Sequence, residues 1–366
     1  MGQPLRVGIV GCGTIAAAYL HTFGRLSTVK VVAAADLDLA RAEAVARDHP
    51  GVRALSVDDL LADDEVDLVL NLTIPAAHAD IGLRAVAAGK SVYGEKPLAS
   101  TTAEARRVLD EATLARVRIG CAPDTVLGTG IQTARKAIDD GVIGSPIAAT
   151  ATLGTAGPER WHPSPDFYYS PGGGPLLDMG PYYISALVTM LGPVMSVVGA
   201  ASRTRANRTI GKGPRQGEVI PVSTDTHVTG VLVHASGVLS TIYMSFDTVA
   251  TQSARIEVHG EEGSLVVPDP NRFDGDVLVR TLATTDWDTL PVSAGYVGAS
   301  RGFGVHDLAS TAADQEPRAG GRLAFHVLDV MESLLRSAYE ARAVAVQSRS
   351  ERPHAVPLQN IIAEDS

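Results

Sequence analysis

The sequence predicts an α/β fold, in which a doubly wound parallel sheet precedes an α+β domain with a large, mostly antiparallel, open sheet. Two observations predict it. In the first third of the chain, short β-branched runs alternate with longer Ala/Leu-rich helical patterns, as in βαβ units with right-handed crossovers. After Pro123, long runs of alternating hydrophobicity are joined by short turns, as in hairpin-connected strands. At 366 residues the chain has room for two domains, which we expect over 1–123 and 124–366.

Each element of the first domain follows from a short run. The predicted strands cover 6–10, 29–35, 68–73 and 91–94, and the predicted helices cover 15–24, 39–48 and 78–88. A further helix is expected to open at Thr101, because Thr101 and Glu104 have the spacing of a capping box ahead of an apolar periodicity. In the second domain, helices are predicted near 130–140, 179–191 and 320–345. Strand runs are predicted over 195–205, over 227–246 with a turn at 234–237, and over 255–267 with a turn at 260–263.

The composition excludes several classes of protein. With 45% hydrophobic residues the chain is expected to be globular rather than disordered, and 31 Lys+Arg against 41 Asp+Glu, without a basic run, argues against nucleic acid and anionic membrane surfaces as partners. Cys12 and Cys121 have neither zinc-module nor disulfide-framework spacing, so a reducing cytoplasm is the expected compartment. No signal peptide is predicted. The long apolar run 184–203 is predicted to be a helix, a stop at Gly192-Pro193 and a strand, rather than a membrane span.

The most informative local motif follows the first predicted strand. Residues 11–16 read GCGTIA, a G-x-G-x-x-A pattern placed between a strand and a helix. The first glycine permits a tight turn, the second lets the backbone approach a pyrophosphate, and the small third residue lets helix and strand pack closely, with the helix N-terminal amides facing the phosphates. The motif predicts a Rossmann-type dinucleotide site that uses Gly11, Gly13, Thr14 and Ile15.

Asp36 strengthens this prediction, because it ends the second predicted strand 20 residues after Ala16. There a carboxylate can accept hydrogen bonds from the adenosine ribose hydroxyls. Asp36 is followed by Leu37 and Asp38 rather than by an arginine, and two carboxylates would repel a ribose 2′-phosphate. NAD is therefore favoured over NADP. The alternative is a glycine turn with an unrelated surface aspartate.

Three motifs resemble those of the glucose-fructose oxidoreductase/inositol dehydrogenase/rhizopine-catabolism (Gfo/Idh/MocA) family. They are the glycine turn with its later Asp36, the segment GEKPLA at 94–99, and the segment GGGPLLDMGPY at 172–182. The segment NLTIPAAH at 71–78 is similar to a further family motif, although its proline stands one place late. The resemblance covers nearly the whole chain.

The resemblance implies an NAD(P)-dependent oxidoreductase acting on CH–OH groups, with a sugar, sugar derivative or cyclitol as substrate. It implies cofactor contacts from Thr73, Pro75, His78, Glu95, Lys96 and Trp161. We assign substrate contacts to Lys96, Asp124, His162, Asp178 and Tyr182. The resemblance also implies a cis peptide bond before Pro97 and a loop around Trp161 over the active site. Because related proteins commonly pair through their sheets, we expect a homodimer or homotetramer.

Lys96 has an independent chemical rationale. It follows a predicted strand at the edge where open α/β sheets bind ligands, and its ammonium can stabilise alkoxide character on a substrate oxygen as a hydride leaves the same carbon. Asp178 and Tyr182 are four residues apart and share a face if their segment is helical. The family usually has a histidine as acid/base at the position of Tyr182. A phenol, with a pKa near ~10, needs a nearby cation for this task, which Lys96 can supply.

Other assignments remain open. Tyr182 can be a core aromatic beside Tyr183, Asp178 a carboxylate favoured by the helix dipole, and His162 the proton acceptor in place of Tyr182. In the proposed chemistry the hydride passes to C4 of the nicotinamide, and no metal is required. Two further functions fit the same motifs: transient oxidation of a glycoside with recycling of NAD, and a catalytically silent regulator that senses NAD or a sugar. The presence of Lys96 together with Asp178 and Tyr182 favours an enzyme.

Overall fold

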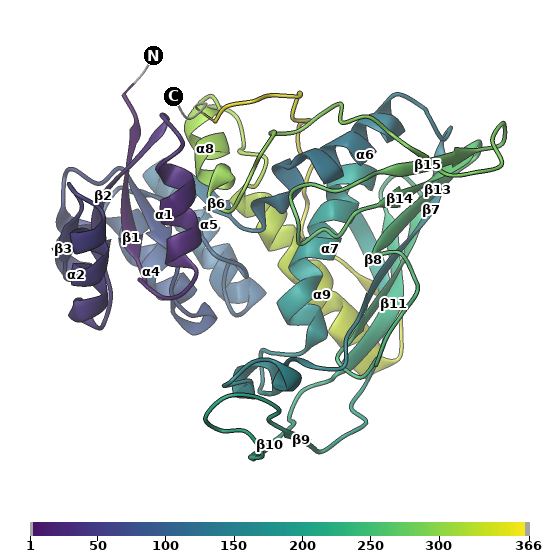
Figure 1. The fold of residues 1–366 in the computed structure, drawn as a ribbon, viewed down its shortest axis with the longest axis horizontal. Coiled ribbons are helices and arrows are strands. Elements are labelled where there is room, and N and C mark those ends of the chain that lie inside the picture. Colours follow the sequence, from purple (N-terminus) through teal and green to yellow (C-terminus); the bar gives the residue numbers. More distant parts are fainter. Residues whose placement is uncertain (1–2, 363–366) are drawn as a thin grey trace. The chain divides into compact units, whose positions relative to one another are not determined.

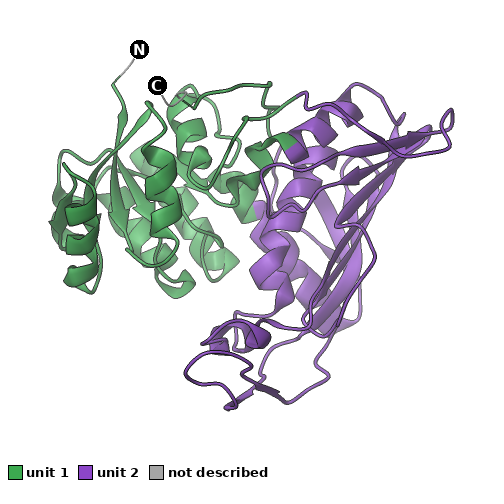
Figure 2. Ribbon diagram, viewed as in Figure 1, with its two compact units in different colours: residues 1–129, 294–325, 353–366 green, residues 130–293, 326–352 purple. Residues whose placement is uncertain are grey.

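The computed structural model describes residues 3–362, which form two compact units (Figure 2). The first unit holds the chain up to residue 129, residues 294–325 and the segment from 353, and the second holds 130–293 and 326–352. The boundary at 129 lies close to the expected one at 123. The later segments join the first unit through bridges such as Gly320 to Gly120 and Tyr296 to Gly128. The chain therefore crosses between the units four times, whereas two continuous domains would need a single crossing.

The first unit contains a six-stranded parallel sheet in the order β3-β2-β1-β4-β5-β6 (Figure 1). Its strands are β1 Leu5–Val10, β2 Val29–Ala35, β3 Arg53–Leu55, β4 Leu68–Asn71, β5 Ser91–Gly94 and β6 Ile119–Cys121. This order is that of a doubly wound Rossmann sheet, with its topological switch between β1 and β4. The predicted fold class is confirmed. The sequence did not reveal β3 and β6, which have only three residues each.

Helices alternate with these strands along the chain. They are α1 Ala16–Phe23, α2 Leu39–Asp48, α3 Val57–Ala62, α4 Pro75–Ala87 and α5 Thr102–Ala115, with α8 Phe303–Ser310 from a later segment. The predicted capping box at the start of α5 is confirmed, because the Thr101 side chain accepts from the Glu104 amide and the Glu104 carboxylate accepts from the Thr101 amide. α4 starts three residues earlier than expected, since Pro75 is tolerated at the first helical position, where no amide is needed.

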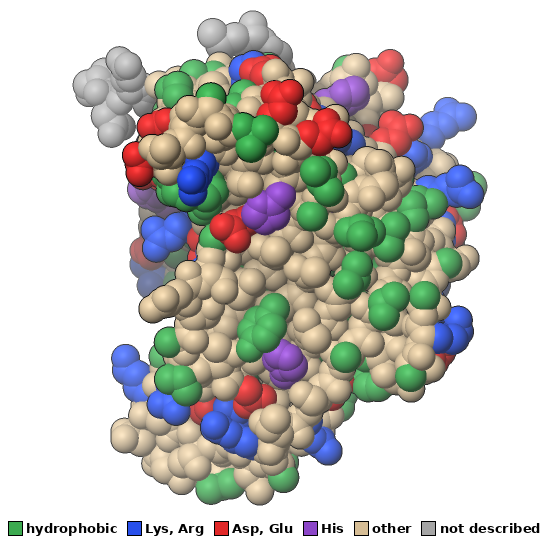
Figure 3. All heavy atoms as spheres, turned by 90° about the vertical axis from the view of Figure 1, so that its right-hand side faces the viewer, with side chains coloured by type: hydrophobic (Ala, Val, Ile, Leu, Met, Phe, Trp, Pro, Cys, Tyr) green, Lys and Arg blue, Asp and Glu red, His purple; other side chains and the backbone are tan. Residues whose placement is uncertain are grey.

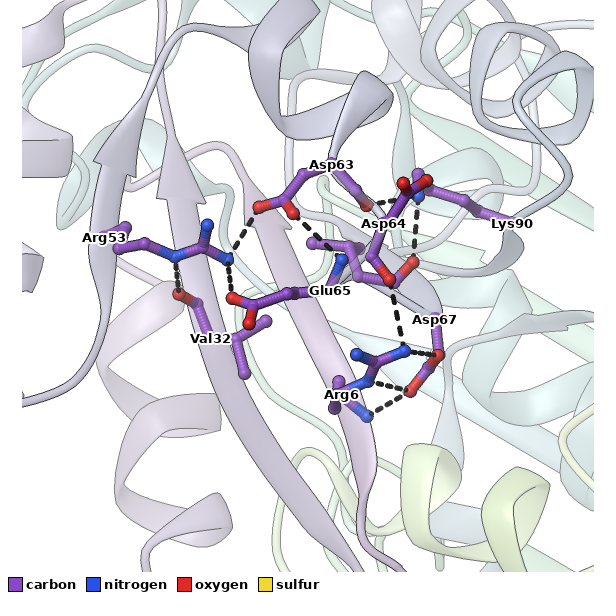
Figure 4. Close-up of polar contacts among 9 residues, drawn as sticks. Arg6, Val32, Arg53, Asp63, Asp64, Glu65, Asp67 and Lys90 are labelled. Carbon is purple, nitrogen blue, oxygen red and sulfur yellow. Dashed lines mark hydrogen bonds and ion pairs between the residues drawn. The ribbon is translucent and has the colours of Figure 1, made fainter.

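A polar cluster ties together the strand ends at the edge of this sheet opposite the glycine turn (Figure 4). Arg6, near the start of β1, forms a bidentate pair with Asp67, just before β4, at 2.6 and 2.9 Å. Arg53, at the start of β3, pairs with Asp63 at 2.6 Å. Lys90, just before β5, donates to two backbone carbonyls that precede β4. These cations are therefore engaged in holding the strand ends together.

The second unit is built on a nine-stranded sheet in the order β16-β15-β14-β13-β7-β12-β11-β8-β17. Its strands are β7 Pro146–Gly154, β8 Val194–Ser202, β11 His227–His234, β12 Leu239–Ser245, β13 Ile256–Gly260, β14 Gly263–Val267, β15 Leu278–Thr281, β16 Asp288–Thr289 and β17 Val344–Ala345. Both expected hairpins are present, as β11–β12 and β13–β14. The sheet is antiparallel except where β12 runs parallel to β7, a central strand that the sequence did not reveal.

Three long helices belong wholly or partly to the second unit: α6 Thr129–Asp139, α7 Pro175–Leu191 and α9 Gly321–Glu340. α7 packs on β11 and β12, and its Ile184 and Leu187 are completely buried. It begins four residues earlier than expected, because Gly174 (φ +90°) turns the chain and Pro175 occupies the first helical position. α9 ends five residues before the expected limit, where Ala341 adopts a left-handed conformation (φ +51°) ahead of β17.

The residues that alternate with buried ones on the central strands of this sheet form a second, partly exposed face. Its middle row, read across β8, β11, β12 and β7, is Val198, Val231, Thr241 and Thr150. Figure 3 shows this side of the molecule, where hydrophobic and uncharged groups fill most of the centre and charged side chains gather mainly toward the margins. Among residues 3–362, no helix combines the length and the apolar character needed to cross a membrane.

Candidate functional site

The glycine turn of the first unit has the shape that a dinucleotide site requires. Gly11 has φ +99°, and a Cβ there would lie 2.7 Å from the backbone of Leu72, so only glycine fits. At Gly13, an added Cβ would meet no described atom within 4 Å, so this stretch of backbone faces open space. α1 starts directly afterwards, and no side chain of residues 3–362 caps it. The Ala16 amide donates to the Gly13 carbonyl at 3.1 Å, so the backbone of the turn and the positive end of the helix dipole, rather than this amide, can serve phosphate oxygens.

Asp36 lies beside this turn, just after β2. Its Oδ2 accepts a hydrogen bond from the Cys12 amide at 2.7 Å, and its Oδ1 accepts one from the Asp38 amide at 2.9 Å. The two bonds hold the half-buried carboxylate where Rossmann folds place the adenosine ribose. Burial and the neighbouring Asp36 raise the pKa of the Cys12 thiol to about 11, so the thiol stays protonated at neutral pH.

Two polar side chains fix the loop after β4. Asn71, the last residue of β4, accepts bonds from the hydroxyl and the amide of Thr73 at 2.6 and 3.3 Å. His78, 3% exposed, has Nδ1 at 2.6 Å from the Pro97 carbonyl oxygen and Nε2 at 3.0 Å from the Thr73 carbonyl oxygen. The imidazole thus links the loops after β4 and β5. Its bonds position Thr73 and Pro97, and the expected contact of these residues and Pro75 with a cofactor stays a prediction.

Lys96 follows β5, as expected, and Glu95 fixes the backbone around it. Glu95 Oε1 accepts from the Tyr19 hydroxyl at 2.9 Å, and Oε2 accepts from the Lys96 amide at 3.1 Å. Tyr19 is fully buried in α1, and both burial and Glu95 hold the pKa of its hydroxyl well above the usual range, so it remains a donor. The Lys96–Pro97 bond is cis, as the resemblance implied. Sequence reasoning missed Tyr19, which carries no local motif, and Asn71, which lies inside the segment 71–78.

Asp124 has a structural task that the sequence did not predict. It opens the 3₁₀ helix Asp124–Leu127, is 1% exposed, and accepts bonds at Oδ2 from the amides of Gly302 and Gly304 at 2.8 and 3.0 Å. Burial raises the pKa of its carboxyl to about 6, and Glu95 adds to the rise, while the two amides oppose it. Asp124 therefore ties the end of β6 to the start of α8, and a role in substrate binding stays a prediction.

In the second unit, α7 carries two of the expected catalytic residues. Because the helix is continuous over Pro175–Leu191, Asp178 and Tyr182 lie one turn apart on the same face, as their spacing predicted. Asp178 is half-buried in the first turn, and Tyr182 is 7% exposed. Tyr183 is fully buried, and burial raises the pKa of its hydroxyl. Both tyrosines of the pair are thus buried, and a catalytic role for Tyr182 stays a prediction.

Trp161 and His162 lie in an excursion of the second unit, which we define as residues 155–175 and 203–225. It contains the two-stranded sheet of β9 Asn207–Thr209 and β10 Val219–Pro221 and the 3₁₀ helices Pro158–Arg160 and Asp166–Tyr169. His162 Nδ1 accepts from the Ser164 amide at 3.0 Å, so the neutral ring carries its proton on Nε2. The Gly174 amide donates to the Tyr168 carbonyl at 2.8 Å, which joins the excursion to the start of α7.

The features of the first unit define the class of the protein. A 3-2-1-4-5-6 sheet, a glycine turn whose second glycine faces open space, an uncapped helix and a carboxylate beside the turn are the parts of a Rossmann dinucleotide-binding protein. The residues present therefore fit an NAD-type cofactor. Within residues 3–362, no group of three His, Cys, Asp or Glu side chains is placed to hold a metal ion.

Comparison with known proteins gives the family. Residues 5–122 match the model described as the oxidoreductase family, NAD-binding Rossmann fold, and residues 131–266 match the GFO/IDH/MocA C-terminal domain. The chain belongs to the Gfo/Idh/MocA family of oxidoreductases. Its relatives are named dehydrogenases and reductases, and it is an oxidoreductase of this type, acting on CH–OH groups.

Individual relatives and solved structures match this chain with modest sequence identity. The 1,5-anhydro-D-fructose reductase of Ensifer adhaerens is 29% identical over 71% of this chain and 75% of its own length. The inositol 2-dehydrogenase/D-chiro-inositol 3-dehydrogenase of Lacticaseibacillus casei is 32% identical, but the match spans 40% of this chain and 44% of that protein. Among solved structures, an NAD binding oxidoreductase from Klebsiella pneumoniae has a TM-score of 0.81 at 25% identity and covers 94% of this chain and 100% of its own. Levoglucosan dehydrogenase in complex with NADH and levoglucosan shares the fold, with a TM-score of 0.78 at 20% identity over 94% and 100% of the two chains.

Proposed function

We propose that this protein is an NAD-dependent dehydrogenase that oxidises a secondary hydroxyl of a sugar, a sugar derivative or a cyclitol. The observation that carries the proposal is the Asp36 carboxylate, which the Cys12 amide holds beside the Gly11–Gly13 turn. Relatives named for inositol and 1,5-anhydro-D-fructose support a cyclic polyhydroxylated substrate. The two free cysteines agree with a function in the reducing cytoplasm.

The preference for NAD over NADP rests on charge at the end of β2. The Asp36 carboxylate would lie beside the ribose and repel a 2′-phosphate there, while the Asp38 carboxylate caps α2 by accepting from the Ala40 amide at 3.2 Å. Arg41, in the first turn of α2, pairs with Asp38 at 3.5 Å. This ion pair reduces the attraction of Arg41 for a phosphate. The glycine turn and α1 would hold the pyrophosphate.

The chain's own residues divide the chemistry. Bound NAD supplies the hydride acceptor at C4 of its nicotinamide. Lys96 donates a hydrogen bond to the reacting hydroxyl and stabilises negative charge that develops on its oxygen. Tyr182, in its phenolate form, accepts the hydroxyl proton and becomes the neutral phenol, with His162 Nε2 as the rival acceptor after tautomer exchange, and Asp178 orients the substrate through hydrogen bonds. Glu95 and His78 act as positioning residues for the Lys96 segment.

The deciding experiment is incubation of the protein with NAD and a panel of sugars, cyclitols and glycosides while NADH absorbance is followed. Sustained NADH formation with at least one cyclic alcohol supports the proposal. Consumption of a glycoside without net NADH would replace it by transient oxidation with recycling of NAD. Binding of NAD without turnover of any compound would replace it by the regulator function.

We also propose that the protein is a homodimer or homotetramer, which pairs through the face formed by Val198, Val231, Thr241 and Thr150. Val231 lies opposite Val198 on one neighbouring strand and Thr241 on the other, so the row is uncharged. An uncharged sheet face of this kind is a suitable surface for burial against a second copy.

A further inference from the structure

A cavity of about 640 Å³ lies at the edge of the Rossmann sheet where the strands begin, opposite the glycine turn. We call it the amino-edge cavity. Its lining comes from the first unit alone and includes the start of β1, the turn before β2, the residues just before β4 and β6, and the end of α8. The polar side chains among the lining residues are Gln3, Arg6, Ser27, Thr28, Asp67 and Arg118. A cavity of this volume can hold a small organic molecule.

The charges in this cavity do not cancel. Arg6 is neutralised by Asp67, whose carboxylate accepts from Nε and Nη2 of that guanidinium at 2.9 and 2.6 Å (Figure 4). Arg118 has no such partner: within residues 3–362, its guanidinium forms no ion pair, and its one hydrogen bond runs from Nη1 to the Thr311 carbonyl at 2.9 Å. The lining contains two arginines and one aspartate, so it carries one excess positive charge, which is located on Arg118.

Burial makes this unpaired charge costly. Arg118 is half-buried, and burial lowers the pKa of its guanidinium, an effect that the nearby Asp307 opposes. The Asp307 carboxylate is already bound by Arg318, through Nη1 at 2.6 Å and through the backbone amide at 2.8 Å. Nε and Nη2 of Arg118, the same pair of donors with which Arg6 binds Asp67, thus remain available to a ligand. A guanidinium presents these two donors in a geometry that matches a carboxylate or phosphate group.

We propose that the amino-edge cavity binds a small hydroxylated anion, whose carboxylate or phosphate group accepts two hydrogen bonds from Nε and Nη2 of Arg118. The side chains of Gln3, Ser27 and Thr28 supply hydrogen-bonding groups for hydroxyls on the body of the ligand. None of these residues has a part in the proposed dehydrogenase chemistry. The inference therefore goes beyond the proposed function and does not depend on it.

The single excess charge favours a small ligand over a macromolecule. Nucleic acids and anionic membranes are bound by several cations that act together, because each contact with a phosphate adds its own increment of affinity. In the amino-edge cavity, Arg118 is the one unpaired cation among the described lining residues, and the chain as a whole carries a formal net charge of −10. One anionic group enclosed in a cavity fits this distribution of charge.

The helix α8 connects the cavity to the opposite edge of the sheet. It lies against β6, and each of its ends is held by a residue that flanks that strand. Arg118, just before β6, donates to the Thr311 carbonyl at the end of α8. Asp124, after β6, accepts from the amides of Gly302 and Gly304 at the start of α8. We therefore expect an anion bound to Arg118 to stabilise the whole helix.

Calorimetric titration of the NADH-loaded protein tests the proposal with two matched pairs of probes. D-Gluconate is compared with sorbitol, and glycerol 3-phosphate with glycerol, at constant ionic strength, so that an anionic group distinguishes the members of each pair. Bound NADH keeps the phosphate probe out of the nucleotide site. We expect at least one anion to bind with a Kd at least tenfold below that of its neutral partner. The anion that binds more tightly identifies the anionic group as carboxylate or phosphate.

Variants of the cavity locate this binding. Arg118→Gln should raise the Kd of that anion at least tenfold, and Arg118→Lys, which keeps the charge but lacks the planar pair of donors, should raise it at least threefold. Ser27→Glu places a carboxylate at an exposed position of the lining and should abolish binding while Arg118 stays in place. Arg107→Gln, which replaces an exposed arginine of α5, is the matched control for the loss of one positive charge and should leave the Kd within twofold.

Hydrogen exchange of the same NADH-loaded protein gives a readout that needs no substitution. We expect the amides of α8 to exchange at least threefold more slowly when the anion is bound, and those of α2 to be unchanged. The proposal is overturned if neither anion binds better than its neutral partner, if Arg118→Gln or Ser27→Glu binds like Arg107→Gln, or if protection appears around Lys96 instead of α8. Because none of these readouts needs turnover, they test the cavity independently of the dehydrogenase function.

Discussion

The His78 imidazole lies 2.6 Å, through Nδ1, from the carbonyl oxygen of Pro97, the residue that follows Lys96. Its other nitrogen lies 3.0 Å from the Thr73 carbonyl oxygen, and the ring is 3% exposed. Two loops at the ligand edge of the Rossmann sheet are therefore connected by one side chain. The direction of the Lys96 segment therefore depends in part on His78, which lies 19 residues before Pro97 in the chain.

We predict that His78→Ala lowers kcat/KM by about tenfold or more, because both loops lose their contact with the buried ring, and lowers the free energy of unfolding by roughly 1–3 kcal/mol. Steady-state kinetics and urea unfolding measure the two effects. His78→Gln, which can still donate to one carbonyl, should recover part of the activity. Parental kinetics in His78→Ala would show that the connection has no functional role.

Cofactor choice depends on Asp36. We expect NAD to bind at least tenfold more tightly than NADP, a difference of about 1.4 kcal/mol, because the carboxylate accepts from ribose hydroxyls and repels a 2′-phosphate. Asp36→Ala should remove most of this preference. Calorimetric titration measures it, with Asp48→Ala, an exposed aspartate at the end of α2, as the control. Equal affinities of the parent for the two cofactors would contradict the assignment.

Three variants distinguish the proposed catalytic roles. Lys96→Ala should reduce turnover by two or more orders of magnitude with little change in NAD affinity, because its donor acts mainly as alkoxide character develops. Tyr182→Phe keeps the ring in its 7% exposed position and removes only the hydroxyl, so an acid/base role predicts a loss of roughly 100-fold. Stopped-flow and steady-state NADH formation measure both.

His162→Ala is the control for the rival base. If Tyr182→Phe is active while His162→Ala is folded but inactive, His162 rather than Tyr182 accepts the proton. Full activity of Lys96→Ala would end the mechanism as proposed.

Stability should fall in mild acid because of His326. The ring is completely buried, its Nε2 accepts from the Val194 amide at 3.0 Å, and burial lowers its pKa to about 4. Below pH ~6.5 the His326 imidazole takes up a proton in the unfolded chain but stays neutral in the folded one. The contribution of neutral His326 to the free energy of unfolding is thus complete above pH ~6.5 and is lost as pH falls toward about 4. The total loss is about 3 kcal/mol.

Denaturant unfolding at pH 7 and pH 5 measures this dependence. Asp124 acts in the opposite direction, since its raised pKa favours the folded state in acid, so the comparison is made between variants. His326→Gln should be less stable than the parent at pH 7 and should lose less on acidification. His354→Gln, at an exposed position, should keep the parental slope. Identical slopes for the parent and His326→Gln would refute the attribution.

Light scattering at micromolar concentration should give the mass of at least two chains of 38.1 kDa. Val231→Lys places a charge in the middle of the proposed pairing face, opposite Val198, and should shift the mass toward one chain. Leu282→Lys, in an 84% exposed position away from that row, should leave the mass unchanged. A parent that scatters as a single chain would exclude pairing through the sheet.

Local signals explain what the sequence could predict. The glycine turn, the Thr101 capping box and both hairpins are determined by residues close together in the chain, and the structure has all of them. β7 was missed because its Ala- and Thr-rich run has no strong alternation, and its parallel partner β12 lies about ninety residues away. Pairing at that distance leaves no local pattern.

The candidate site shows the same difference between residues that a local motif reveals and residues that only long-range folding brings together. Local motifs pointed to Asp36, Lys96 and Asp178, although the bonds of Asp36 to Cys12 and of His78 to Pro97 join residues 24 and 19 positions apart. The network of Arg208, Glu159 and Asp247 could not be predicted, because its members are separated by 49 and 39 residues and each looks like a surface charge in the sequence. Their burial follows only from the way the excursion folds back on itself.

The four crossings between the units determine when the Rossmann unit can be finished during synthesis. Val356, 1% exposed, belongs to that unit, and its carbonyl accepts from the Gly295 amide at 2.9 Å. Gln359 donates to the carbonyl of the same glycine at 3.1 Å. All six strands of its sheet lie within residues 5–121, so a nascent chain can form the sheet early, whereas the segments 294–325 and 353–362 join the unit only later in translation. A nascent chain that has formed only this sheet leaves exposed the surface that the two later segments cover in the complete unit, and such surface is a binding site for chaperones.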